Sequence, residues 1–491
     1  MSKTNKKTIC FDNEKYIRLQ SAEINKRIKT FGGKLYMEFG GKIFDDLHFV
    51  RVLPGYDKDS KAAILESLRD KLEVILCISA NDIEKSRVNT NLGISYEVNL
   101  LRLIEKFKSL KIPVAAVVIT LYDDQAAAHK FKTQLEHRGV KTYFHTYTEG
   151  YPTDVETIVS DKGYGAQPYI KTTRPLVVVT APGSNSGKLA TCLSQLYHEY
   201  KRGVRAGYAK FETFPVWDLP LKHPVNAAYE ASTADIGDTN MIDNFHLEKY
   251  GETAVNYNRD LAVFPILKNI LHQIIGKDIY HSPTDMGVNV IGKCIVDDKA
   301  ACRASHDEII RRYLGSLCDY KNGLYDIDVP NRIKVLMDEL NISVDDRPVV
   351  PVALAAQAKK KSNVVAIELS PKKIVTGRDT DIMTAPASAV INAIKELSKI
   401  EDKIHLISPA NLQPMLQLKR EVYGETRLNL HDVLVALAVS AITNPTVELA
   451  LSNLPRLQGL EAHSTVMLPG IGIDALKKLG LNITCTDEVI G

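Results

Sequence analysis

Over the first 214 residues, two hydrophobic patterns alternate along the chain. Short runs of apolar residues are each followed by a polar stretch of helical length that carries an apolar stripe. Continuous apolar runs bounded by amphipathic helices are typical of a parallel sheet covered on both faces. We therefore predict an α/β fold with a doubly wound, mainly parallel sheet over residues 1–214. The expected strands are Lys34–Phe39, Val74–Ser79, Val114–Leu121, Thr142–His145, Leu176–Thr180 and Ala206–Lys210.

The pattern changes twice further along the chain. Residues 215–346 lose the alternation and start with a polar stretch, His223–Asp260, which predicts a loop-rich and helical middle region. From residue 347 short apolar runs return, so we predict a smaller α/β domain over residues 347–491. A chain of 491 residues is too long for one compact core, which agrees with several domains. The strands and helix expected in the last domain are Val364–Leu369, Ile374–Thr376, Ala385–Leu397, His405–Ser408, Ser464–Leu468 and Asn482–Thr484.

The composition of the chain argues against several classes of protein. The chain has 62 Lys and Arg against 59 Asp and Glu, a net charge of +3. It therefore lacks the excess of basic residues that is typical of proteins that bind nucleic acid. No apolar run approaches the thickness of a bilayer, and no signal core follows the basic start. We expect a cytoplasmic protein without membrane or nucleic-acid partners. Seven scattered cysteines without a C-x-x-C pair make a zinc site or a disulfide framework unexpected.

The strongest chemical signal is a glycine- and serine-rich loop within residues 175–203. It follows the strand Leu176–Thr180 and ends at Lys188, where a helix is expected to begin. Such a loop turns backbone N–H groups inward, the helix N-terminus adds partial positive charge, and a lysine adds a full charge. The segment therefore predicts a phosphate site. Its candidate residues are Gly183, Ser184, Asn185, Ser186, Gly187 and Lys188.

The loop departs from the pattern G-x-x-x-x-G-K-[S/T] at two positions. Pro182 stands where the first glycine is expected and removes one backbone donor. Leu189 stands where Ser or Thr normally supplies a hydroxyl to Mg²⁺. Thr191 lies too far round the helix to replace that hydroxyl. The alternative is a plain strand-to-helix turn with Lys188 in solvent.

The block from this loop to the next strand resembles dethiobiotin synthetase and its relatives. The helix is followed by Gly203-Val-Arg-Ala-Gly-Tyr-Ala-Lys-Phe-Glu-Thr, and in those P-loop enzymes a comparable strand ends in a lysine across the nucleotide site. The resemblance implies that Lys188 and Lys210 act together, with Glu212 or Asp235 as the acidic group. Without that geometry Lys210 is an exposed charge at a strand end.

Other polar residues follow the expected strands or lie in the polar stretch. They line the same edge in a parallel sheet, where ligands bind beyond the carboxyl ends of the strands. Alternatives remain open, because glycines also make tight turns and Asp residues also cap helices. We expect the stretch His223–Asp260 to cover the site as a lid. The additional candidates are Gly40, Gly41, Lys42, Asp82, Asp123, His223 and Arg259.

The last domain is weakly similar to the cytidine-deaminase fold. The expected hairpin Val364–Thr376 and the helix Ala385–Leu397 carry that resemblance. The helix begins with Thr384-Ala-Pro-Ala-Ser-Ala, which contains no zinc ligand, and no C-x-x-C follows. The resemblance implies a scaffold without deaminase chemistry.

Several segments together resemble, nearly end to end, one bacterial family that is described only as a domain of unknown function. The resemblance supplies no activity and no catalytic residue. It is carried by Phe11-Asp-Asn-Glu-Lys-Tyr, Phe39-Gly-Gly-Lys, Thr180-Ala-Pro-Gly-Ser-Asn-Ser-Gly-Lys-Leu-Ala-Thr, Asn256-Tyr-Asn-Arg-Asp and Ser282-Pro-Thr-Asp-Met-Gly-Val-Asn.

Two functions follow as hypotheses. The first is an enzyme that binds a nucleotide or another phosphorylated metabolite and catalyses phosphoryl transfer or ATP-dependent ligation, with Lys188, Lys210 and Glu212 or Asp235 as catalytic residues. The second is a non-catalytic metabolite-binding or regulatory protein. ATP or another nucleotide is the candidate cofactor, and zinc is not expected. The sequence does not decide whether Mg²⁺ takes part or whether the protein forms a homo-oligomer. The expected partner is a small phosphorylated or anionic ligand.

Overall fold

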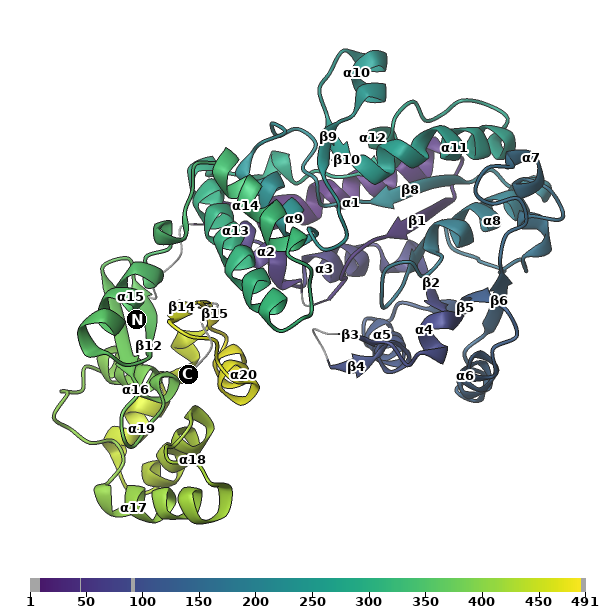
Figure 1. Ribbon diagram of the computed structural model, residues 1–491. Helices are drawn as coiled ribbons and strands as arrows, with labels where there is room; N and C mark the ends of the chain where they lie inside the picture. The colour runs from purple at the N-terminus through teal and green to yellow at the C-terminus, as the bar shows by residue number, and fades with distance from the viewer. Residues whose placement is uncertain (1–8, 45, 90–92, 487–491) are drawn as a thin grey trace. The chain divides into compact units, whose positions relative to one another are not determined.

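The chain has the predicted α/β architecture, as the computed structural model in Figure 1 shows. The structure describes residues 9–44, 46–89 and 93–486. Within them, one compact unit covers residues 9–230 and 237–305, and a second covers residues 231–236 and 306–486. The sheet-bearing first unit therefore includes much of the middle region.

The first unit is built on a seven-stranded sheet in the order β11-β8-β1-β7-β2-β5-β6. Every neighbouring pair in this sheet is parallel, which confirms the expectation from the apolar runs. The N-terminal strand β1 lies between β7 and β8, which are much later in sequence. The strands are β1 (Leu35–Phe39), β2 (Leu72–Ser79), β5 (Val114–Tyr122), β6 (Thr142–Thr146), β7 (Leu176–Thr180), β8 (Gly207–Phe211) and β11 (Gly287–Val288).

One face of this sheet is covered by the helix α8 (Lys188–Lys201). Its apolar residues recur at helical spacing, and Cys192, Leu193 and Leu196 are almost fully buried against β1, β7 and β8. Tyr36 of β1 points to this helix, because its hydroxyl donates to Glu199 Oε1 at 2.8 Å. Side chains alternate along a strand, so Glu38, two residues later, is on the same face.

The remaining elements of the first unit include helices, short strands and turns. The short β9–β10 pair is antiparallel. The elements are α1 (Asn13–Thr30), α2 (Leu47–Val52), α3 (Ser60–Ser67), η1 (Arg69–Lys71), α4 (Ala80–Glu84), β3 (Val88–Asn89), β4 (Ile94–Ser95), α5 (Tyr96–Ser109), α6 (Ala126–His137), α7 (Val155–Ile158), η2 (Tyr164–Ala166), α9 (Pro224–Ser232), β9 (Asn240–Ile242), α10 (Asn244–Tyr250), β10 (Val255–Tyr257), α11 (Asn258–Ile275), α12 (Pro283–Met286), η3 (Gly292–Cys294) and α13 (Asp298–Lys321). The helices α9 and α13 each continue into the second unit.

The second unit contains a smaller mixed sheet in the order β13-β12-β14-β15. The strand β12 is antiparallel to both neighbours, whereas β14 and β15 are parallel. Its elements are α14 (Asp328–Glu339), η4 (Val344–Asp346), α15 (Val349–Lys360), β12 (Val364–Ser370), β13 (Lys373–Arg378), α16 (Ala385–Ser398), α17 (Pro409–Leu418), η5 (Lys419–Tyr423), α18 (Leu430–Ala441), α19 (Pro445–Leu451), η6 (Leu454–Leu457), β14 (Glu461–Ser464), α20 (Gly470–Lys478) and β15 (Asn482–Cys485).

Two strand predictions in this unit need correction. His405–Ser408 is wrong as a strand: Leu406 and Ile407 are buried, but they lie in a loop that pairs with no strand of the described sheet. The strand expected at Ser464–Leu468 instead spans Glu461–Ser464. In both places the apolar residues are a sign that the segment is buried. A buried segment does not have to pair with a strand of the sheet.

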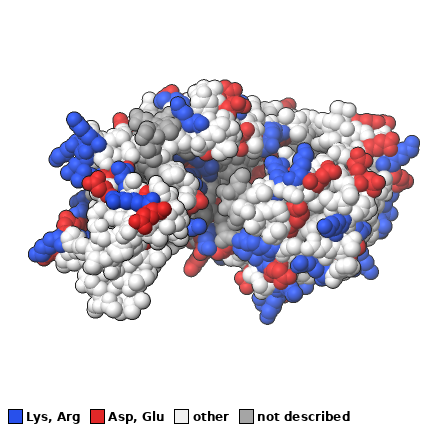
Figure 2. Space-filling model, turned by 60° about the horizontal axis from the view of Figure 1, so that its bottom comes forward, with Lys and Arg blue, Asp and Glu red and all other residues white. Residues whose placement is uncertain are grey.

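The surface and the helices agree with the balanced composition. On the face drawn in Figure 2, Lys and Arg are interspersed with Asp and Glu, as a net charge of +3 leads one to expect. Among the described residues, no helix is both long enough and apolar enough to cross a membrane. The seven cysteines are free thiols.

Candidate functional site

The loop between β7 and α8, residues 181–187, is tightly folded. Asn185 and Gly187 both adopt left-handed backbone conformations, with φ of +53° and +74°. Ser186 between them is buried, and its carbonyl oxygen accepts a hydrogen bond from Thr120 Oγ1 at 2.9 Å. Ser186 Oγ donates to the carbonyl of Gly183 at 3.1 Å. These contacts hold the loop in one conformation at the start of α8.

The backbone N–H groups of this turn donate to no acceptor among the residues that the structure describes. Across residues 183–190, all of which the structure describes, no backbone N–H donates to another described group, and the N-cap Gly187 has no side chain to cap the helix. Free amides next to left-handed residues at a helix N-terminus are a feature of many anion-binding sites. The loop thus has the donors that a phosphate group requires.

Both glycines of the loop allow close packing. A Cβ added at Gly183 would lie 2.4 Å from the ring of Tyr96, and one at Gly187 would lie 2.8 Å from Thr120 Cγ2. The positive φ of Gly187 is a second reason for glycine there. The conformation that frees the amides therefore depends on the absence of a side chain at these two positions.

Lys188 lies directly beside the loop. Its Nζ donates to Ser186 Oγ at 3.3 Å, and the residue is half-buried. Thr191 does not replace the hydroxyl that Leu189 lacks, because Thr191 is fully buried and donates to the carbonyl of Gly187 at 2.9 Å. The loop therefore offers amides and one ammonium group, without the usual hydroxyl for Mg²⁺.

The second lysine is aligned with the loop through the sheet register. Val179, Glu38 and Lys210 are direct cross-strand neighbours on β7, β1 and β8. Each is the penultimate residue of its strand, so all three lie at the same edge of the sheet from which the 181–187 loop leaves. Lys210 is therefore separated from the loop strand by one strand, and that strand carries a carboxylate.

Glu38 acts electrostatically on Cys77 of β2 and on Lys210 of β8. Burial raises the pKa of Cys77 to about 12, and that thiol experiences both Lys188, which lowers its pKa, and Glu38, which raises it. Glu38 also acts on Lys210 and accepts a hydrogen bond from Tyr208 at 2.8 Å. Glu38 Oε1 has no hydrogen-bond partner among the described groups. One oxygen of the carboxylate that acts on Lys210 is therefore available to a further partner.

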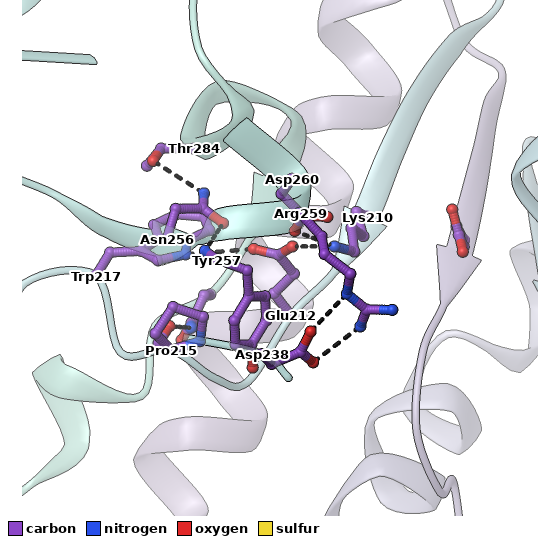
Figure 3. A network of polar contacts seen from close by, with 12 residues as sticks. Lys210, Glu212, Pro215, Trp217, Asp238, Asn256, Tyr257, Arg259, Asp260 and Thr284 are labelled. Atoms are coloured by element: carbon purple, nitrogen blue, oxygen red, sulfur yellow. Dashed lines mark hydrogen bonds and ion pairs between the residues drawn. The ribbon is translucent and has the colours of Figure 1, made fainter. Parts of the chain in front are cut away.

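Lys210 lies between two further carboxylates, as Figure 3 shows. Its Nζ is 2.9 Å from Glu212 Oε1 and also pairs with Asp260, the third residue of α11. Burial opposes the charge of Lys210, but Asp260 and Glu212 raise its pKa well above the usual value. Burial raises the pKa of Glu212 to about 7, although Lys210 acts against this. Glu212 is thus a group that can exchange a proton near neutral pH.

A second ion pair borders this group in Figure 3. Arg259 Nη2 donates to Asp238 Oδ2 at 2.8 Å, with Asp238 buried and Arg259 more than half exposed. Burial raises the pKa of Asp238, and Arg259 opposes the shift. On the other side, Trp217 Nε1 donates to Glu212 Oε2 at 3.3 Å. The polar stretch after β8 thus supplies Asp238, Arg259 and Asp260 around Lys210.

The remaining predicted residues have different surroundings. Gly40, Gly41 and Lys42 directly follow β1 at the edge that carries Glu38, and Gly41 has a φ of +67°. Asp82 follows β2 and pairs with Arg87 at 3.3 Å. The exposed Asp123 follows β5, and its backbone N–H donates to Gln125 Oε1 at 2.8 Å. Asp235 belongs to the second compact unit, where its charge acts on Tyr325.

His223 forms a separate group with Asp298 and Cys302. Its Nε2 lies 3.0 Å from Asp298 Oδ1 and 3.6 Å from Cys302 Sγ, so the three ligand atoms are close enough to hold a metal ion. However, the backbone N–H of Val225 donates to His223 Nδ1 at 3.2 Å, which caps the start of α9. The neutral ring then carries its proton on Nε2. A metal ion bound there would require that cap to break.

Two residues of the site were missed by the sequence reasoning. Glu38 lay inside an expected strand, and Asp260 was the last residue of the expected lid. The sequence signal for Glu38 was a charged side chain in a buried apolar strand, flanked by Met37 and Phe39. The signal for Asp260 was its place at a helix start, where carboxylates are favoured.

Comparisons with known proteins cover nearly the whole chain. Residues 9–341 match the family model "Domain of unknown function DUF1846, N-terminal", and residues 345–489 match its C-terminal counterpart. The chain is 51% identical over 491 residues to a UPF0371 protein of Clostridium tetani, with 98% of each chain covered. It is 50% identical over 493 residues to a UPF0371 protein of Clostridium botulinum strain Langeland, again with 98% of each chain covered. The chain therefore belongs to the DUF1846 family, of which these UPF0371 proteins are relatives.

Proposed function

We propose that the protein is an enzyme that binds a nucleotide or another phosphorylated metabolite at the 181–187 loop. The observation that carries the proposal is the run of free backbone amides at the N-terminus of α8, with Lys188 beside them. Free amides, the helix dipole and an ammonium group together stabilise a phosphate dianion. The reaction class that fits is phosphoryl transfer or ATP-dependent ligation.

The roles of the other residues follow from their charges. Lys188 neutralises the bound phosphate, and the amides of Ser184–Gly187 orient it. The positive charge of Lys210 stabilises the negative charge that develops on the transferred group. Glu38 is the carboxylate on the strand between β8, which carries Lys210, and β7, which leads into the loop. Glu212, with its pKa of about 7, takes or returns the proton of the reacting group. This assignment replaces Asp235, which is in the second compact unit, with Glu38.

The proposal does not require that Mg²⁺ bind as in a standard P-loop. Leu189 supplies no hydroxyl, and the hydroxyl of Thr191 is engaged by Gly187. Carboxylate oxygens are ligands that Mg²⁺ accepts, and Glu38 is the residue in this site that would hold the ion together with phosphate oxygens. Mg²⁺ would there neutralise phosphate charge.

Substitution of Lys188 by alanine tests the proposal. We expect ATP, GTP or pyrophosphate, each with and without Mg²⁺, to raise the melting temperature of the wild-type protein by a few degrees, since ligand at 100 times its Kd stabilises by about 2.7 kcal/mol. Lys188→Ala should lose this protection. Thermal-shift measurements on both proteins check it.

The matched control is Lys201→Ala at the other end of α8. Lys201 is exposed and pairs with Asp161 at 3.5 Å, so its loss should leave the ligand-induced shift unchanged. Equal loss in both variants would indicate a general effect of charge. A wild-type protein that no phosphate compound protects would exclude the proposed site.

A non-catalytic binding protein is the second candidate. Leu189 stands where a Mg²⁺-binding hydroxyl is usual, and this favours the binding protein. The loop can bind phosphate without the hydroxyl that supports phosphoryl transfer. A measurement of product formation distinguishes the enzyme from the binding protein. Binding that depends on Lys188, without turnover of any bound nucleotide in the presence or absence of Mg²⁺, would select the binding protein over the enzyme.

A further inference from the structure

The second compact unit contains a pocket of about 450 Å³ that no sequence motif indicated. It lies among α15, β13, α16 and the loop that precedes α17. The volume is in the range of pockets that bind small molecules. Its apolar wall includes Ile391, Ile407 and Leu412.

The charged residues that line the pocket have one sign. They are Lys360, Arg378 and Lys395, and His405 adds an imidazole. No aspartate or glutamate is among the described lining residues. Such a lining creates a positive potential inside the pocket, and low-dielectric walls strengthen it. Anions are therefore the ligands that the pocket favours.

Lys395 is the residue that points most directly to a ligand. Its side chain is 94% buried, being 6% exposed, and its Nζ donates to the backbone carbonyl of Asp402 at 2.6 Å. In the part of the chain that the structure describes, no carboxylate pairs with it. A buried ammonium without an opposite charge is unfavourable by several kcal/mol. Two of its three donor protons remain for another partner.

Other buried cations of the same unit do have carboxylate partners. Arg347 pairs with Glu461 at 2.8 Å, and Lys419 pairs with Glu425 at 2.6 Å. Lys395 thus differs from these two cations, and it is one of the residues that line the pocket. Ser388 and Thr376 on the same walls offer further polar groups to a ligand.

Close packing on one side of the pocket keeps its walls fixed. The strand β13 approaches α16 at Gly377, where an added Cβ would lie 2.0 Å from the backbone nitrogen of Ala389. This contact holds Arg378 on β13 and Lys395 on α16 within a rigid pair of elements. A preformed site loses little entropy when it binds a ligand.

We propose that this pocket binds a small organic anion, with its phosphate or carboxylate group held by Lys395 and Arg378 and its apolar body against Ile391 and Ile407. The pocket shares no residue with the 181–187 loop, which lies in the other compact unit. The second compact unit would then bind a ligand different from the one at the 181–187 loop.

The test is calorimetric titration of the full chain carrying Lys188→Ala, which removes the first site from the measurement. Phenyl phosphate, benzoate and inorganic phosphate are the probes, each at up to about 10 mM. We expect phenyl phosphate or benzoate to bind, and Lys395→Met to weaken that binding at least tenfold. Binding of phenyl phosphate alone assigns a phosphate ester, and binding of benzoate alone assigns a carboxylate.

Two further variants make the result decisive. Arg378→Gln changes an exposed residue of the pocket and should also weaken binding, whereas Lys359→Met, next to the lining residue Lys360 on α15, should not. Lys395→Met should also melt no lower than the parent without ligand, because it removes an unpaired buried charge. Absence of binding by all three probes, or unchanged binding in both Lys395→Met and Arg378→Gln, would overturn the proposal.

Discussion

Replacement of Lys210 by methionine is expected to destabilise the protein by about 3 kcal/mol at pH 8 and by much less at pH 5. At pH 8 the substitution leaves the carboxylates of Glu212 and Asp260 facing each other without their cation. Glu212 is only 4% exposed, so water cannot replace Lys210 there. At pH 5 Glu212 is protonated, and the missing cation matters less.

The direction of this pH dependence follows from the pKa of Glu212. Burial raises it from 4.5 to about 7 in the folded protein, so the folded state binds the proton more tightly than the unfolded chain. The wild-type protein should therefore lose stability as the pH rises from about 4.5 to about 7. Removal of Lys210 raises that pKa further, so the variant should continue to lose stability above pH 7.

Urea unfolding of both proteins between pH 5 and pH 9 measures the effect. The control is Lys210→Met with Glu212→Gln, in which the extra loss above pH 7 should largely disappear because the proton-binding group is gone. A destabilisation by Lys210→Met that is the same at pH 5 and pH 8 would contradict the assigned coupling between Lys210 and Glu212.

Replacement of Lys34 by methionine should also lower the free energy of unfolding, by about 3–5 kcal/mol. Lys34 pairs with Glu199, which is 1% exposed and also accepts a hydrogen bond from Tyr36 at 2.8 Å. Without Lys34 the charge of Glu199 remains buried beneath the sheet. This pair lies near the C-terminal end of α8, away from the 181–187 loop.

A double-mutant cycle checks the second prediction. Lys34→Met combined with Glu199→Gln should recover much of the stability, because the glutamine keeps acceptor atoms for Tyr36 without the buried charge. Lys201→Met is the matched control, since its exposed pair with Asp161 contributes at most about 1 kcal/mol. Additive losses in the Lys34 and Glu199 variants would show that the two side chains do not interact.

Local pattern predicted most strands of the large sheet. The strand Leu176–Thr180 and the helix start at Lys188 agree with the sequence prediction residue for residue, because an apolar run and a glycine loop are local signals. The edge strand Gly287–Val288 was missed, since two residues carry no periodicity. Residue type and spacing thus predicted the elements well where the elements were long.

Strand order could not be predicted in the same way, and the composition of the site depends on it. Glu38 became part of the site only because β1 lies between β7 and β8, a pairing between segments far apart in sequence. Asp260 joined Lys210 because α11 begins beside the end of β8. The acidic candidates chosen from the sequence, Glu212 and Asp235, both follow Lys210 within 25 residues along the chain.

The place of β1 also affects how the protein is made. Both neighbours of β1 in the sheet begin at or after Leu176, so β1 leaves the ribosome long before either edge can pair. At translation rates of 5–20 residues per second, this interval lasts roughly 10–30 s. During that time an apolar strand, Leu35–Phe39, has two open edges, the condition under which strands associate between chains. Nascent chains that stop before β8 are therefore the aggregation-prone species in the synthesis of this protein, and chaperone demand falls once residue 211 is available.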